Sequence, residues 1–138
     1  MITGQVANKN LDSSERFYLG GASGVRAYPS SEGGGAEGSL ATLELRWVMS
    51  ERYTLNAFHD SGAVRVNYNN QYSGATTLNT FRLSGNGLGF TWFGEKGATV
   101  RATVARRIGD NPNATSAGKD QDGSLLRNRV WVSLQVPF

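Results

Sequence analysis

The sequence holds few side chains that could carry out enzymatic chemistry. His59 is the only histidine and the chain has no cysteine, which excludes thiolate nucleophiles and thiolate metal sites. Asp60 follows His59 directly, but adjacent residues of a strand point to opposite faces and cannot form a proton relay. We therefore expect no catalytic residue, and we expect His59 to lie near a lipid interface or a turn.

Two glycine-rich runs and a group of aspartates also lack the spacing of known sites. Residues 85–89 superficially resemble a phosphate-binding loop, but no strand–loop–helix unit surrounds them, and we expect these glycines to leave room for an inserted loop. Residues 20–24 lack the spacing of a nucleophile elbow. Three aspartates match no EF-hand pattern, and we assign them to the solubility of a surface loop: Asp110, Asp120 and Asp122. No cofactor and no metal site is predicted.

Alternation of apolar and polar residues predicts the elements that must position any site. From Arg129 to Phe138 every even position is apolar, whereas the odd positions are mostly polar. The same period of two predicts four further strands, at 39–47, 53–66, 83–93 and 98–107. Ile2–Ala7 looks like the end of another strand.

The lengths of the connections give these strands an orientation. The connections at 48–52 and 94–97 are short, whereas those at 8–38, 67–82 and 109–128 are long and polar. Short turns on one side and long loops on the other are typical of an outer-membrane β-barrel. Aromatic residues near the predicted strand ends fit interfacial girdles: Trp47, Tyr53, Trp92, Phe93 and Phe138.

Composition favours the same fold class. The 138 residues include 18 glycines and only 18% charged residues, which favours strands and turns over long helices. No apolar stretch approaches the roughly 18 residues of a transmembrane helix. The 14 basic residues are scattered, so we expect no nucleic-acid partner. Five strands and a partial one cannot close a membrane barrel, which needs about eight. We expect an all-β, antiparallel transmembrane β-barrel fragment, with residues 1–138 forming the C-terminal part of one barrel domain whose beginning is missing.

Three motifs resemble those of a known family. Val25-Arg26-Ala27-Tyr28 is similar to the Val-Arg-Gly-Tyr/Phe motif in the sixth extracellular loop of two-partner-secretion transporters, the haemolysin secretion/activation family of the BamA-like superfamily. Ala27 replaces the superfamily's glycine, and Ala-Tyr-Pro looks like the transporter branch. The run from Phe58 through Asp60 to Gly62 is similar to the superfamily's Phe-x-Asp-x-Gly. The terminal strand, 129–138, with Leu134, Val136 and the final Phe138, resembles the β-signal read by the barrel-assembly machinery.

The resemblance implies how some of these residues act. In a larger barrel, of about 16 strands, the loop at 17–38 would fold into the lumen, and Arg26 would pair with Asp60 while Tyr28 packs beside them. Physical chemistry agrees, because an arginine fork binds a carboxylate through two donors and alternation places Asp60 on the lumen face. The alternative is a solvated Arg26 on a mobile loop. Other charges would line the polypeptide path or simply be solvated: Glu44, Arg46, Arg101 and Arg107.

The resemblance implies transport rather than catalysis. We expect an outer-membrane component that translocates a large secreted exoprotein of the haemolysin or adhesin type, its pore gated or stabilised by the loop of Arg26. The partners would be that exoprotein, outer-membrane lipid and, during biogenesis, the barrel-assembly machinery. Two alternatives stay open. One is a barrel-assembly factor of the same superfamily, and the other is a soluble β-sandwich binding module whose apolar face at 130–138 packs on a second sheet.

Overall fold

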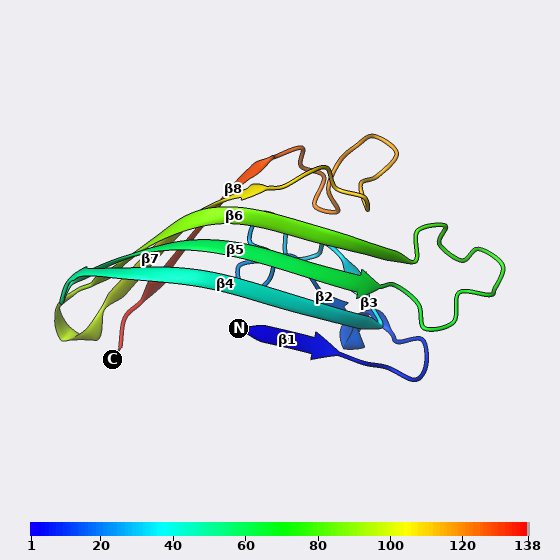
Figure 1. Cartoon of the computed structure of the whole chain (residues 1–138), viewed down its shortest axis with the longest axis horizontal. Helices are drawn as coiled ribbons and strands as arrows, with labels where there is room; N and C mark the ends of the chain where they lie inside the picture. The colour runs from blue at the N-terminus through cyan, green and yellow to red at the C-terminus, as the bar shows by residue number, and fades with distance from the viewer. Residues whose placement is uncertain (138) are drawn as a thin grey trace.

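The computed structural model describes residues 1–137, and its main element is one antiparallel sheet of six strands (Figure 1). The strands lie in the order β1 (Ile2–Gln5), β4 (Glu37–Ser50), β5 (Tyr53–Arg65), β6 (Thr80–Phe93), β7 (Thr99–Arg107) and β8 (Asn128–Gln135). A small ribbon pairs β2 (Phe17–Tyr18) with β3 (Gly34–Gly35), and two short 3-10 turns are η1 (Ser13–Glu15) and η2 (Glu95–Gly97). The expected all-β, antiparallel fold class is therefore confirmed. Within residues 1–137 no helix is long and apolar enough to cross a membrane.

Some strands are longer than predicted, because their pairing with a neighbouring strand continues beyond the residues in which apolar and polar side chains alternate. β4 extends beyond 39–47 because its pairing with β5 continues to Glu37 and, past a bulge, to Ser50. β6 begins at Thr80 rather than at 83, since its first residues still pair with β5. β8 ends at Gln135, where its pairing with Thr99 stops. Phe138, which we expect to be part of the assembly signal, lies outside the described residues.

Short and long connections lie at opposite ends of the sheet. The turns at 51–52 and 94–98 lie at one end, and the loops at 66–79 and 108–127 lie at the other (Figure 1). The predicted loop at 8–38 is partly structured, because it contains the β2–β3 ribbon and ends where β4 begins at Glu37.

The outer, convex face of the sheet carries an exposed apolar band. Residues paired across five strands form its first row: Leu45, Ala57, Leu88, Val104 and Val130. The next row consists of Trp47, Leu55, Phe90, Ala102 and Val132. Leu45 is 76% exposed and Val132 is 71% exposed, so no part of residues 1–137 covers these side chains. This face is the one that a barrel turns toward lipid.

The band ends at a mostly polar row on the side of the long loops. Leu43 pairs there with His59, His59 with Asn86, and Asn86 with Arg106. His59 Nδ1 and Asn86 Oδ1 lie 2.7 Å apart and share a hydrogen bond on the exposed outer face. His59 therefore lies at the edge of the apolar band and points away from Asp60, as the alternation of a strand requires.

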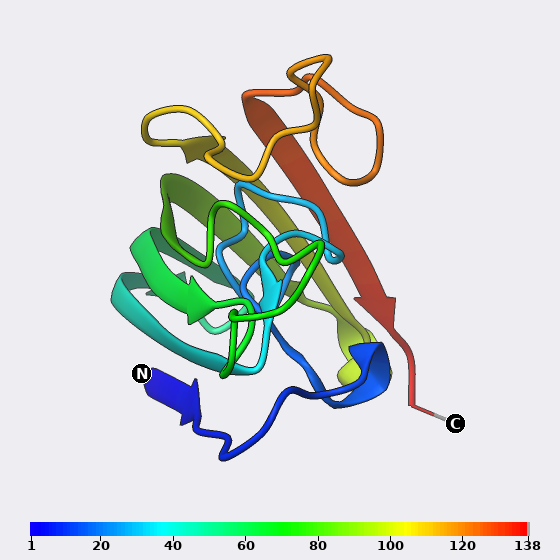
Figure 2. The same cartoon turned by 90° about the vertical axis from the view of Figure 1, so that its right-hand side faces the viewer.

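The buried core lies on the inner, concave face, between the sheet and the segment 19–36. Figure 2 shows the sheet curling around this segment, which we call the inserted loop. Core residues from the inserted loop meet core residues from β4 to β7; the cluster consists of Leu19, Val25, Ala27, Tyr28, Leu40, Phe58, Val64, Phe81, Leu83 and Ala105. The hydrophobic effect thus holds a loop, rather than a second sheet, against the concave face.

Inward-facing glycines on β6 leave space for side chains that approach the strand. A Cβ atom on Gly85 would come within 2.6 Å of the Ala27 Cβ, so this glycine makes room for the inserted loop as expected. A Cβ on Gly87 would come within 2.2 Å of Phe58 Cζ instead. The expectation for the run at 85–89 is thus wrong for Gly87 and Gly89, because Phe58 and Asn56 of the neighbouring strand β5, rather than the loop, fill their space.

Candidate functional site

Arg26 reaches from the inserted loop to the inner wall of the sheet, where it binds Asp60 of β5. Arg26 Nε donates to Asp60 Oδ2 at 2.9 Å, and Arg26 Nη2 donates to Asp60 Oδ1 at 2.9 Å. The backbone N–H of Arg26 donates to Oδ2 as well, at 3.1 Å. Asp60 is fully buried, and 14% of the Arg26 side chain is exposed. The pair is therefore a charge-assisted fork with an additional backbone bond.

Four neighbours hold this pair in place. Thr42 Oγ1 donates to Asp60 Oδ1 at 3.0 Å from the facing position on β4. The Arg26 guanidinium lies 3.3 Å from the centroid of the Phe58 ring, close enough for a cation–π interaction. Arg26 Nη1 donates to Glu44 Oε2 at 3.3 Å. Trp131 Nε1 donates to the Arg26 carbonyl at 2.8 Å, which connects the loop to β8.

The inserted loop presents Arg26 from a compact backbone. The Val25 N–H donates to the Leu19 carbonyl at 2.6 Å, and the Gly21 N–H donates to the Tyr28 carbonyl at 3.0 Å. Gly24 is required here, because a Cβ at this position would lie 2.1 Å from the Leu19 carbonyl oxygen. These local bonds fix the backbone that presents Arg26 to the sheet.

The remaining motif residues pack where the loop meets the wall. Val25 and Ala27 are fully buried in the core. Gly62 faces Leu19, whose Cδ2 would lie 2.5 Å from a Cβ at that position. Tyr28 is fully buried and its ring lies 4.9 Å from the Arg107 guanidinium of β7. Burial raises the pKa of Tyr28 above its ordinary value, so the hydroxyl is neutral at physiological pH.

The other lumen-facing charges fall into two groups. Glu44, Arg46 and Arg101 line an open cavity of about 520 Å³ together with Arg26 and Trp131. Arg107 does not line this cavity, contrary to expectation, because the last long loop covers it and leaves 8% of its side chain exposed. In the assembly-signal segment, Leu134 and Val136 are exposed, with Leu134 in the outer apolar face, while Phe138 lies outside residues 1–137.

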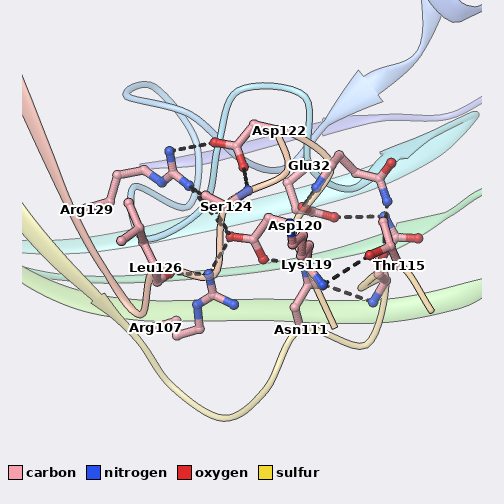
Figure 3. A network of polar contacts seen from close by, with 12 residues as sticks. Glu32, Arg107, Asn111, Thr115, Lys119, Asp120, Asp122, Ser124, Leu126 and Arg129 are labelled. Carbon is pink, nitrogen blue, oxygen red and sulfur yellow. Dashed lines mark hydrogen bonds and ion pairs between the residues drawn. The ribbon is translucent and has the colours of Figure 1, made fainter. Parts of the chain in front are cut away.

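A second polar cluster was not expected from the sequence. Figure 3 shows Asp120 between Arg107 and Arg129, with Glu32 of the inserted loop nearby. Asp120 is 1% exposed, so the assignment of this residue to loop solubility is wrong. Asp110 does lie on the surface, where it pairs with Arg127. For Asp122, burial raises the pKa, but hydrogen bonds from Ser124 and Arg129 outweigh this effect and lower it.

The geometry leads to comparison with known proteins. A family model described as haemolysin secretion/activation protein ShlB/FhaC/HecB matches residues 1–92, which contain both Arg26 and Asp60. The chain belongs to this family. Members of the ShlB/FhaC/HecB family are two-partner-secretion transporters of the outer membrane rather than enzymes. The exposed apolar outer band and the charged residues on the inner wall are those of a partial β-barrel, in agreement with this membership.

Curated relatives extend the match over the chain. The heme/hemopexin transporter protein HuxB of Haemophilus influenzae strain Rd is 29% identical over 141 aligned residues, covering 99% of this chain. HuxB of strain 86-028NP shows the same identity and coverage. The chain spans 23% of the length of these relatives. No solved structure gives a significant match.

Proposed function

We propose that residues 1–138 form the C-terminal part of the barrel of an outer-membrane transporter that passes a large secreted exoprotein to the cell surface. The observation that carries this proposal is the buried Arg26–Asp60 fork, which attaches the inserted loop to the inner wall at 2.9 Å. A loop held inside a barrel restricts the lumen. Its release would widen the path, so the fork would act as a latch of the pore.

The two faces of the sheet support this proposal. The outer rows are apolar and exposed, whereas the cavity beneath the inserted loop is lined by Arg26, Glu44, Arg46 and Arg101. The same cavity is also lined by Phe93 and Trp131, so its wall offers a passing polypeptide both charged and apolar contacts. A soluble β-sandwich would bury the face at 130–138, yet no second sheet covers it within residues 1–137.

The proposed cargo is a protein rather than a free haem. HuxB is named as a heme/hemopexin transporter. Among residues 1–137, those that line the cavity include no histidine, cysteine, methionine or tyrosine that could bind haem iron. The arginines and carboxylates of the cavity would instead exchange transient contacts with a passing polypeptide.

Secretion by the full-length transporter tests the proposal. Secretion would require that the latch holds and releases the loop in turn, so Arg26→Ala and Asp60→Ala, which leave the loop without its latch, should each lower the amount of exoprotein released, measured relative to folded barrel in the outer membrane. Asp110→Ala is a matched control, because its carboxylate is 87% exposed on the surface. Normal secretion by both latch variants would refute the latch. A general loss of other outer-membrane barrels would instead indicate an assembly factor of the same superfamily.

A further inference from the structure

A second polar contact joins the inserted loop to the last long loop, away from the Arg26–Asp60 fork. Glu32, fully buried at the end of the inserted loop, accepts two hydrogen bonds from this last loop. Asn113 Nδ2 donates to Glu32 Oε1 at 2.8 Å, and the backbone N–H of Gln121 donates to Oε2 at 3.0 Å. These donors lie 81 and 89 residues further along the chain. The contact is therefore purely tertiary.

Asp120 holds the last loop in the shape that this contact requires. Asn111 Nδ2 donates to Asp120 Oδ1 at 3.0 Å, and the Asp120 N–H donates to the Ser124 carbonyl at 2.8 Å. Arg107 donates to Asp120 Oδ2 from the end of β7, and Arg129 Nη2 lies 3.6 Å from the same oxygen at the start of β8 (Figure 3). Asp120 thus ties the loop to both strands that it connects.

The buried charge of Glu32 makes it depend on its hydrogen bonds to the last loop. A buried carboxylate is costly unless it is hydrogen-bonded. The side-chain bonds to Glu32 within residues 1–137 come from Asn113 and Gln121, and no ion pair to Glu32 is present there. If the last loop moved while the inserted loop stayed, Glu32 would lose both donors. The positions of the two loops are therefore coupled.

We propose that Glu32 and Asp120 are positioning residues that form a second, surface-side anchor of the inserted loop, so that the pore opens only when the last loop releases Glu32. This inference rests on the proposed function, because it assumes that the inserted loop closes the pore. The two anchors hold the inserted loop to different parts of the barrel. Arg26 attaches the loop to β5, whereas Glu32 attaches it to the connection between β7 and β8.

Single-channel recording of the full-length transporter in planar lipid bilayers tests this anchor. Glu32→Gln replaces a carboxylate oxygen with an NH2 group that cannot accept a hydrogen bond. Asp120→Asn makes the same change and also removes the negative charge next to Arg107 and Arg129. Each variant should raise the ratio of open to closed time about tenfold, the effect of losing hydrogen bonds to a charged acceptor. Asp110→Asn, an exposed carboxylate of the same loop, should leave the ratio within about twofold, since surface pairs contribute little.

Two further measurements show whether Glu32 and Asp120 position the loop, whether they are needed only for folding, and whether their effect is distinct from that of the Arg26–Asp60 latch. The amount of folded barrel, read from heat-modifiable mobility in gels, should be unchanged, because a merely structural role would lower it without changing the open ratio of the folded molecules. If Glu32→Gln prevents assembly, Asn113→Ala removes only one donor and should raise the open ratio several-fold. Wild-type ratios in Glu32→Gln and Asp120→Asn, or in Asn113→Ala where it replaces them, would overturn the second anchor.

Arg26→Ala in the same recordings shows which proposal fails. If Arg26→Ala opens the pore and Glu32→Gln does not, the second anchor is wrong and the latch stands. If neither variant changes the open ratio, the inserted loop does not close the pore, and both the latch and the anchor are refuted. If both variants open the pore, the double variant should open it further, because one anchor acts on β5 and the other on the loop between β7 and β8.

Discussion

Asp60→Asn is the sharpest perturbation of the proposed latch, because it removes one charge and keeps the shape of the side chain. The amide can accept from only one of the two side-chain donors of Arg26, and its NH2 group faces the other. Glu44, at 3.3 Å, would remain as the acidic partner of Arg26. The substitution therefore breaks the fork while leaving Arg26, the inserted loop and the wall otherwise intact.

The expected effect follows from burial. Removing one partner of a buried ion pair costs about 3–5 kcal/mol. Asp60 is fully buried, but Arg26 borders the open cavity and keeps Glu44, so we expect the lower end, about 3 kcal/mol. Since about 1.4 kcal/mol corresponds to a factor of ten, the undocked population of the loop should rise about 100-fold.

Limited trypsin digestion of the folded, full-length protein measures this population. The bond after Arg26 is buried while the loop is docked, and its cleavage rate follows the open population when opening is fast. Lys9, on the exposed segment before η1, provides an internal reference whose cleavage should not change. Thr42→Ala removes one hydrogen bond to the Asp60 carboxylate and should speed cleavage after Arg26 about tenfold.

A specific result would refute this reasoning. If Asp60→Asn is folded and Arg26 is cleaved within about twofold of the wild-type rate, the fork contributes far less than its burial implies. Docking of the loop would then depend on the apolar core around Leu19, Val25 and Tyr28 rather than on the ion pair.

Two further predictions test the packing and the orientation of the sheet. Gly85→Ala should weaken docking of the inserted loop, because the new Cβ would lie 2.6 Å from the Ala27 Cβ; adding Ala27→Gly should restore docking only in part, since the Arg106 carbonyl oxygen still lies 3.0 Å away. Faster trypsin cleavage after Arg26 reports the first effect, and equal rates in the single and double variants would contradict the packing argument. Val132→Arg on the outer band should destabilise the barrel by about 2–4 kcal/mol in urea unfolding from lipid vesicles. Ser133→Arg, on the adjacent lumen-facing residue, should have little effect, and equal losses would show that the faces are assigned wrongly.

The alternation of residues predicted most of the fold, because side chains of a strand point to opposite faces with a period of two. The outward set at 130–136 and the inward position of Asp60 both follow from this local rule. Strand ends were less predictable. β4 extends to Ser50 across a bulge, and such pairing depends on the neighbouring strand rather than on the pattern of β4 itself.

The site was predictable only in part. The resemblance to a known family singled out Arg26 and Asp60 together, since each lies in a recognisable motif, and the structure brings the two side chains into contact. Their role as a latch stays a prediction, as does the role of Phe138 as an assembly signal. Nothing in the local sequence indicated that Trp131 donates to the Arg26 carbonyl, because a single polar atom on an aromatic side chain leaves no periodic pattern.

The sequence by itself determined which face of each strand is apolar, which connections are long, and which arginine and aspartate belong to family motifs. Only the tertiary structure decided that Glu32 and Asp120 are buried and joined through the last loop. Their partners lie tens of residues away, and the same acidic residues would be solvated on an open loop. Burial and pairing of a charge depend on what folds over it, and this is a property of the assembled chain rather than of any segment.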